Sequence, residues 1–303
     1  MIIVPEHKIE YETCNVPDAD YEIWSSSKSY STGDKVSILE DKLNYFATKN
    51  IAAGVRPSPA DLKGLKTGWF AETPNKYKML GNTIYNQTTN PDLIEFSFKI
   101  SDIDIIAFFN IDAKDINIKI TKVYSGVTIM DKKINMLENG ISLYHYFFVE
   151  PWFKDTFIYD FKNEVPIFME EVLVEIKLSK PNSIAKCGKF FAGKSEELGC
   201  SLWQNSSIKT KSFGKIKQDE YFGNYEIERG NTVNQISVKV KAETHKIDYI
   251  ISKLKKYAYD YCLFVADDSQ RITNFTAYGL AEDVNFSPQP YSSEYTLKIG
   301  STI

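Results

Sequence analysis

The chain has 303 residues, of which 43% are hydrophobic and 25% are charged, with a formal net charge of -4 at pH 7. This length allows two or three domains, each large enough to bury a core. The acidic balance lacks the basic surface that nucleic-acid binding requires, and no apolar run approaches the roughly 20 residues that span a membrane, so we expect neither a nucleic-acid partner nor membrane insertion.

Residues 1–20 predict an extended N-terminal arm. The arm opens with the apolar strand Ile2-Ile3-Val4 and ends in a polar segment around Pro17. Arms of this kind often pair with a neighbouring subunit. The sequence also lacks the basic start and apolar run of a secretory signal, so we expect folding in the cytoplasm.

Residues 21–81 predict a small β-meander module rich in aromatic side chains. Trp24 and Tyr30 flank a turn whose glycine, Gly33, can take a left-handed backbone, and Tyr45 and Trp69 supply further rings. A domain this small needs such rings for its core. Exposed rings could instead contact a protein partner or stack on a sugar. These four aromatic residues are therefore the candidate contact residues, with all three interpretations open.

Residues 82–182 predict a β-sandwich. Four segments have strand patterns, three with alternating apolar residues and one apolar on both faces. They are 93–100, 105–111, 116–123 and 172–178. Aspartate-rich breaks between them indicate turns. The strongly aromatic stretch 144–153 is interpreted as an edge excursion or a contact surface.

Residues 183–303 predict an α+β unit. Apolar residues at helical spacing over 246–259 indicate one amphipathic helix lying on a sheet. The strands of that sheet are predicted at 236–242, 261–265, 275–279 and 295–299. The boundary before residue 183 rests on Pro181-Asn182 and a change of pattern. The whole chain is thus predicted to be mainly β.

The histidines, acidic residues and cysteines of the chain do not form a recognisable catalytic motif, so we expect that the protein is not an enzyme. The sequence contains only three histidines, and it lacks a nucleophile elbow, a phosphate loop and a zinc-protease motif. Glu170 and Glu171 would face opposite ways on a strand and cannot act as a glycosidase pair. The four cysteines lack metal-ligand spacing, so no metal and no cofactor is expected. Cys187 and Cys200 could lie across a hairpin, but a reducing cytoplasm favours free thiols.

The order of residues in the module resembles that of small chitin- and cellulose-type carbohydrate-binding modules. It has Trp24, a Tyr30-Ser-Thr-Gly33-Asp34-Lys-Val36 hairpin, a strand tyrosine at position 45 and a late Trp69. The segment 73–79, Thr-Pro-Asn-Lys-Tyr-Lys-Met, narrows the resemblance to a family of tailed-bacteriophage tail or baseplate proteins in which such a module opens the chain. Asn86-Gln87-Thr88-Thr89, which follows this segment, supports the same narrower resemblance. Weaker matches continue at Cys187-Gly188, Gly193, Leu198-Gly199, Gly223, Arg229 and Thr276-x-Tyr278-Gly279.

The chain also departs from this family. Lys76-Tyr77 stands where the family usually has Arg-Trp, and Leu80-Gly81 stands where it favours Phe-Asp. The resemblance implies a virion structural protein of a tail tip or baseplate, assembled in the host cytoplasm with other tail proteins as a symmetric homo-oligomer. The alternative is a glycan-binding adhesin module that contacts the host cell envelope. A carbohydrate-cleaving enzyme is the third hypothesis.

Overall fold

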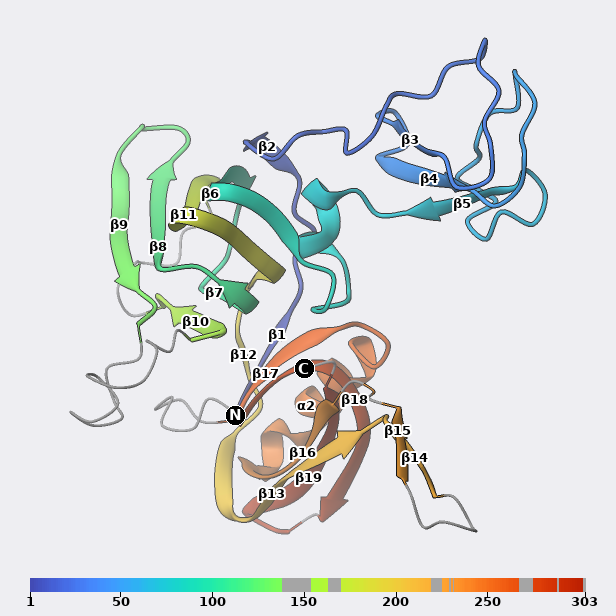
Figure 1. Ribbon diagram of the computed structural model, residues 1–303. Helices are drawn as coiled ribbons and strands as arrows, with labels where there is room; N and C mark the ends of the chain where they lie inside the picture. The colour runs from blue at the N-terminus through green and yellow to red at the C-terminus, as the bar shows by residue number, and fades with distance from the viewer. Residues whose placement is uncertain are drawn as a thin grey trace, which may run out of the picture.

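The computed structural model describes residues 1–137, 154–162, 170–218, 225–228, 230, 232–266, 275–287 and 289–301. Strands dominate these ranges, and the one α-helix within them lies near the C-terminus, so the predicted mainly β architecture is confirmed. Figure 1 shows a sandwich, a second β unit with the helix, and a small module standing off to one side. The aromatic stretch 144–153, with His145, lies outside the described residues.

The sandwich is built around one long bent strand. Its first half pairs with β6 and β8, and its second half pairs with β7 and, over residues 184–187, still with β6. A register shift between Ser179 and Ile184 separates the two halves. The strands are β2 (Tyr11–Cys14), β6 (Thr88–Ile100), β7 (Ile105–Asp112), β8 (Asp115–Lys122), β9 (Thr128–Asn135), β10 (Thr156–Asp160) and the long β11 (Val172–Gly193). The predicted boundary at 182–183 therefore falls inside β11, because Pro181-Asn182 forms an irregularity in the strand and not a linker.

The core of the sandwich is aromatic at its centre. Phe96, Phe98, Phe108 and Phe190 are fully buried, and the ring of Phe190 lies 5.0–5.3 Å from the other three. This packing follows from the alternation predicted for β6, which places residues 94, 96, 98 and 100 on the buried face.

The second unit is a sheet that closes on itself. Its strand order is β12-β1-β17-β18-β19-β16-β13. The strands are β1 (Ile2–Pro5), β12 (Glu196–Glu197), β13 (Cys200–Ser212), β16 (Thr232–Glu243), β17 (Cys262–Val265), β18 (Thr276–Ser287) and β19 (Ser292–Ser301). β12 and β13 stand at opposite ends of this order, yet only Leu198-Gly199 separates them in the chain. The unit is therefore a barrel, and we call it the barrel below.

Gly199 makes the closure of the barrel feasible. Its φ is +126°, and a Cβ atom there would lie 2.6 Å from the carbonyl oxygen of Lys241. The Tyr295 hydroxyl donates a hydrogen bond of 2.7 Å to the carbonyl oxygen of Leu198 and holds the link against the core. Helix α2 (Ile247–Lys256) packs Ile250 and Leu254 onto this core, as the predicted helix on a sheet requires.

The predicted N-terminal arm is not free in the structure. β1 pairs with β17 and β12 inside the barrel, and β2 pairs with β6 of the sandwich. Ile3 and Val4 are buried, with 1% and 0% of their surface exposed. These apolar side chains find their partners within the same chain, and the segment between the two strands ties the barrel to the sandwich.

The module is an insertion between β2 and β6. It contains a three-stranded antiparallel sheet of β3 (Lys35–Ile38), β4 (Leu43–Ala47) and β5 (Trp69–Glu72). The 3-10 helix η1 (Asn75–Leu80) then leads back to the sandwich, where Met79 is buried in its core.

All four cysteines are free thiols. Cys187 and Cys262 are buried, Cys14 is half-buried and Cys200 is exposed. Cys187 lies in the core of the sandwich, whereas Cys200 lies on the surface of the barrel, so the two predicted neighbours belong to different units.

A thiol reagent should therefore distinguish the cysteines. In the native protein we expect Cys200 to react first and Cys14 more slowly, and we expect Cys187 and Cys262 to react only when urea is added. Counting released chromophore with and without urea, with a Cys200→Ser variant as the control, measures this. Rapid reaction of more than two thiols without urea would contradict the assigned burial.

The protein should lose stability progressively above about pH 9. Burial raises the pKa of Cys187 and Cys262 to about 12 and also raises the pKa of Tyr278 and Tyr295 above its usual range. The unfolded chain releases these protons at lower pH than the native protein does, so ionisation favours unfolding as pH rises. Lys189 opposes this trend, because burial lowers its pKa, but the cysteine and tyrosine groups whose pKa is raised outnumber it. Urea midpoints measured from about pH 8 to 11 should fall steadily, and a constant midpoint would refute the prediction.

Candidate functional site

Three of the four candidate aromatic residues form the core of the module. The exposed fractions of Trp69, Tyr45 and Tyr30 are 0%, 1% and 4%. The rings of Tyr30 and Trp69 meet edge to face at 5.1 Å, and the Trp69 indole donates a hydrogen bond of 3.1 Å to the carbonyl oxygen of Val55. Strand alternation explains this, since positions 45 and 69 both face the interior. Their side chains are thus committed to packing.

Trp24 differs from the other three. It is half-buried and packs against the same core from its edge. It follows Ile23, which bridges to Ser37 and is 56% exposed. The structure therefore gathers all four candidate residues into one cluster, and only Trp24 keeps an accessible side.

The opposite face of the module's sheet carries aromatic residues that sequence reasoning missed. Phe46 and Phe70 are direct cross-strand partners on β4 and β5, and Phe70 is 45% exposed. Lys35 pairs with Phe46, and Lys63 bridges to Phe70, so a lysine flanks the pair on each side. Strand alternation in the sequence could have predicted these outward-facing residues. If positions 45 and 69 face inward, the next positions, 46 and 70, must face outward.

An apolar interface joins the sandwich to the barrel. Ile105 and Phe109 of β7 meet Leu263 and Val265 of β17, together with Tyr278 of β18, and all five are buried. The Tyr278 ring stacks 5.9 Å from the ring of Phe109. The two units therefore pack as one body.

A buried charge network crosses the same interface. Lys189 of β11 is completely buried, and its ammonium group donates to one Glu6 carboxylate oxygen at 2.5 Å. The Tyr278 hydroxyl donates to the other Glu6 oxygen at 2.9 Å. Burial lowers the pKa of Lys189, whereas Glu6 acts in the opposite direction. Both carboxylate oxygens of Glu6 already accept hydrogen bonds from these groups, so this residue fixes the two units together and is not a free base.

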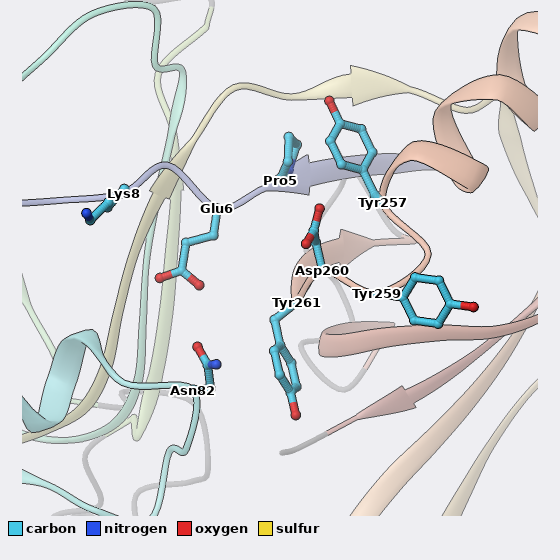
Figure 2. Close-up of a pocket in the computed structure, with 8 residues that line it drawn as sticks. All are labelled: Pro5, Glu6, Lys8, Asn82, Tyr257, Tyr259, Asp260 and Tyr261. Atoms are coloured by element: carbon cyan, nitrogen blue, oxygen red, sulfur yellow. The ribbon is translucent and has the colours of Figure 1, made fainter. Parts of the chain in front are cut away.

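A cleft of about 480 Å³ opens beside this network. Figure 2 shows Glu6 and Asn82 on one side of the cleft and the Tyr257–Tyr261 segment on the other. Tyr259 is 95% exposed, and the Tyr261 ring stacks on Tyr278 at 5.7 Å. The lining mixes tyrosine rings with carboxylates and an amide. Glu6 is already engaged, and the described lining residues include no nucleophile paired with a base.

The described residues contain no group of three or more His, Cys, Asp or Glu side chains that could hold a metal ion. His7 and His245, the two histidines that are described, are not brought together: the backbone N–H of His7 donates to Ala192 in the link between the units, and His245 is exposed beside Glu243. No helix in the described part of the chain is long and apolar enough to cross a membrane.

A β-ribbon extends from the barrel. From here on we call this ribbon the arm; it is distinct from the N-terminal residues 1–20. It comprises residues 207–212 of β13, β14 (Lys215–Gln218), β15 (Tyr225–Glu228) and residues 232–237 of β16. Among the described strands, β14 and β15 pair only with each other, and Figure 1 shows them projecting beyond the barrel. Phe213 and Ile227 of this region are 56% and 64% exposed.

Two glycines face each other where the arm bends. A Cβ atom on Gly230 would lie 2.5 Å from the carbonyl carbon of Phe213 and 2.6 Å from the backbone nitrogen of Gly214. Only glycine allows the two backbones to approach so closely. The bend between the barrel and the projecting hairpin is therefore built into the sequence.

No protein-family model matches this chain, and a search of curated proteins finds no match either.

Proposed function

We propose that this protein is a structural component of a tailed-bacteriophage tail tip or baseplate and that it acts through protein–protein assembly, without catalysis. The resemblance of the module and of residues 73–79 to such proteins supports this assignment. The observation that supports it most directly is the arm, which projects from the barrel and leaves the apolar side chains of Phe213 and Ile227 more than half exposed.

An arm of this construction gains stability when another subunit covers it. An isolated two-stranded hairpin is marginally stable in water. Phe213 and Ile227 keep apolar surface in solvent, and contiguous exposed apolar surface usually marks an interaction site. We therefore propose a symmetric homo-oligomer in which the arm contacts a neighbouring copy, with other tail proteins as further partners, in a virion assembled in the host cytoplasm.

Two measurements test this proposal. Gold-labelled antibody to the recombinant protein should decorate the distal end of the tail in electron micrographs of purified particles. In solution, light scattering should report an oligomer whose dissociation constant rises at least about tenfold in a Phe213→Ser/Ile227→Ser variant. A Tyr124→Ser variant, which changes a 98% exposed residue on the sandwich, is the matched control. Unlabelled intact and broken tails, together with a monomer at all concentrations, would refute the proposal.

The alternative proposal is a glycan-binding adhesin. Its structural support is narrower than the sequence implies, since Trp24 is the one accessible member of the four rings and Phe70 lies on the other face. A glycan array with Trp24→Ala and Phe70→Ala variants separates the two faces. Absence of binding, or binding that neither substitution weakens, would eliminate this alternative. Release of reducing ends from host polysaccharide would instead favour the third hypothesis, an enzyme.

A further inference from the structure

The end of the module's sheet that lies away from the rest of the chain has an unusual surface. We call it the tip: it comprises residues 48–50 and 61–68. The tip immediately precedes β5, which runs away from it toward η1 and the sandwich (Figure 1). The backbone N–H of Thr48 donates to the carbonyl oxygen of Gly68, which joins the two segments of the tip at 2.9 Å.

The loop of the tip is rigidly organised by one carboxylate. Asp61 accepts hydrogen bonds from the backbone N–H groups of Leu65, Lys66 and Thr67 at 2.7–3.0 Å, and from the Thr67 hydroxyl at 3.0 Å. These bonds lower the pKa of Asp61, led by the backbone bond from Thr67. Gly64, with φ +67°, allows the tight turn, because a Cβ atom there would lie 2.9 Å from the backbone of Trp69. The loop is thus preorganised before any partner arrives.

This rigid loop presents apolar side chains to water. Leu65 is 82% exposed and Leu62 is 54% exposed. The backbone N–H of Leu65 donates to Asp61 at 3.0 Å, and the loop holds the Leu65 side chain in solvent in this conformation. Burying these two exposed leucines against a partner would remove apolar surface from water, which favours binding.

Positive charge surrounds the two leucines. Lys49, Lys63 and Lys66 are exposed, and none of them forms an ion pair with the part of the chain that the structure describes. Asp61 is the one acidic residue within the tip, and it keeps its negative charge while it accepts the hydrogen bonds that hold the loop. Three lysines against one aspartate give the residues of the tip a formal charge of +2, in a chain whose formal net charge is -4.

We propose that the tip docks on the surface of an anionic lipid bilayer, with Leu65 and Leu62 entering the interfacial layer and the three lysines lying against the headgroups. Lysines beside exposed leucines are the combination that binds membrane interfaces without a spanning segment. A soluble polyanion would use the lysines but gain nothing from the leucines. This inference rests on the tip alone and does not depend on the proposed phage function.

Vesicle sedimentation with the full chain tests the inference. The protein should pellet with vesicles of phosphatidylcholine that contain about one third phosphatidylglycerol, and it should stay in the supernatant with pure phosphatidylcholine. Binding should weaken as salt is raised. We expect Leu65→Ser to weaken binding at least about tenfold and Lys66→Glu to weaken it by fivefold or more, at roughly fivefold for each basic charge lost.

Matched controls keep these results interpretable. Tyr124→Ser removes an exposed apolar side chain elsewhere, and Lys255→Glu makes the same charge change on the exposed face of α2, so both should bind as the unaltered protein does. Circular dichroism should show that each variant is folded. Equal binding to both kinds of vesicle, or binding that neither tip substitution weakens, would overturn the inference. Competition by polyglutamate together with insensitivity to Leu65→Ser would also overturn it, in favour of a soluble polyanion.

Discussion

Replacing Lys189 with alanine is expected to lower the free energy of unfolding by about 3–5 kcal/mol, the usual cost of removing one partner from a buried ion pair. Lys189 is completely buried and meets Glu6 at the interface between sandwich and barrel. Without the ammonium group, the Glu6 carboxylate keeps only the hydrogen bond from the Tyr278 hydroxyl. The negative charge would then lie at the edge of an apolar interface, where the Glu6 side chain is only 23% exposed, toward the cleft.

Urea unfolding followed by circular dichroism measures this loss. A Glu6→Gln/Lys189→Met double variant should recover most of the stability, since it removes both charges and keeps the volume. Lys186→Ala is the matched surface control on the same strand, because Lys186 lies 3.9 Å from Asp112 in an exposed pair worth less than about 1 kcal/mol. If Lys189→Ala were as mild as this control, the buried network would not hold the two units together.

Val265→Asp should also destabilise the protein by several kcal/mol, on the order of 3–5, and unfold the barrel at physiological temperature. Val265 ends β17, pairs with Ile2 and Thr276 on either side, and is 5% exposed within the interface core. A carboxylate at this position would have neither an ionic partner nor access to bulk water.

A matched substitution separates burial from the chemical change. Val127→Asp introduces the same group at a residue that is 56% exposed, and its effect on thermal unfolding should stay within about 0.5 kcal/mol. An ordinary melting curve for Val265→Asp would mean that β17 is not a strand buried on both faces.

Much of the fold could be predicted because strand periodicity is a local property. The alternation around Phe96 and Phe98 and the helical spacing of Ile250 and Leu254 were enough to predict β6 and α2. The pairing of β1 with β17 could not be predicted, since nothing local in Ile2-Ile3-Val4 specifies a partner some 260 residues away. The continuity of β11 was missed for a related reason: Pro181-Asn182 has the composition of a linker, but the strand accommodates it as an irregularity.

The sequence identified the candidate aromatic residues of the module as one group. It did not show which of their rings face the core and which face the solvent. Sequence order alone cannot say whether a ring such as Trp69 faces the core or the solvent until its cross-strand partner, Ala47, is known. The Glu6–Lys189 network gave no sequence signal at all, because its two members belong to segments that meet only in the folded chain.

The pairing of the first strand with a late one has a consequence for synthesis on the ribosome. Ile2, Ile3 and Val4 are synthesised well before their partners Leu263, Phe264 and Val265, which lie about 260 residues later in the chain. At roughly 5–20 residues per second, the nascent chain therefore carries an unpaired apolar strand for about ten seconds or longer. The sandwich can begin to fold during this delay, whereas the barrel cannot be completed until the strand at residues 262–265 has left the ribosome.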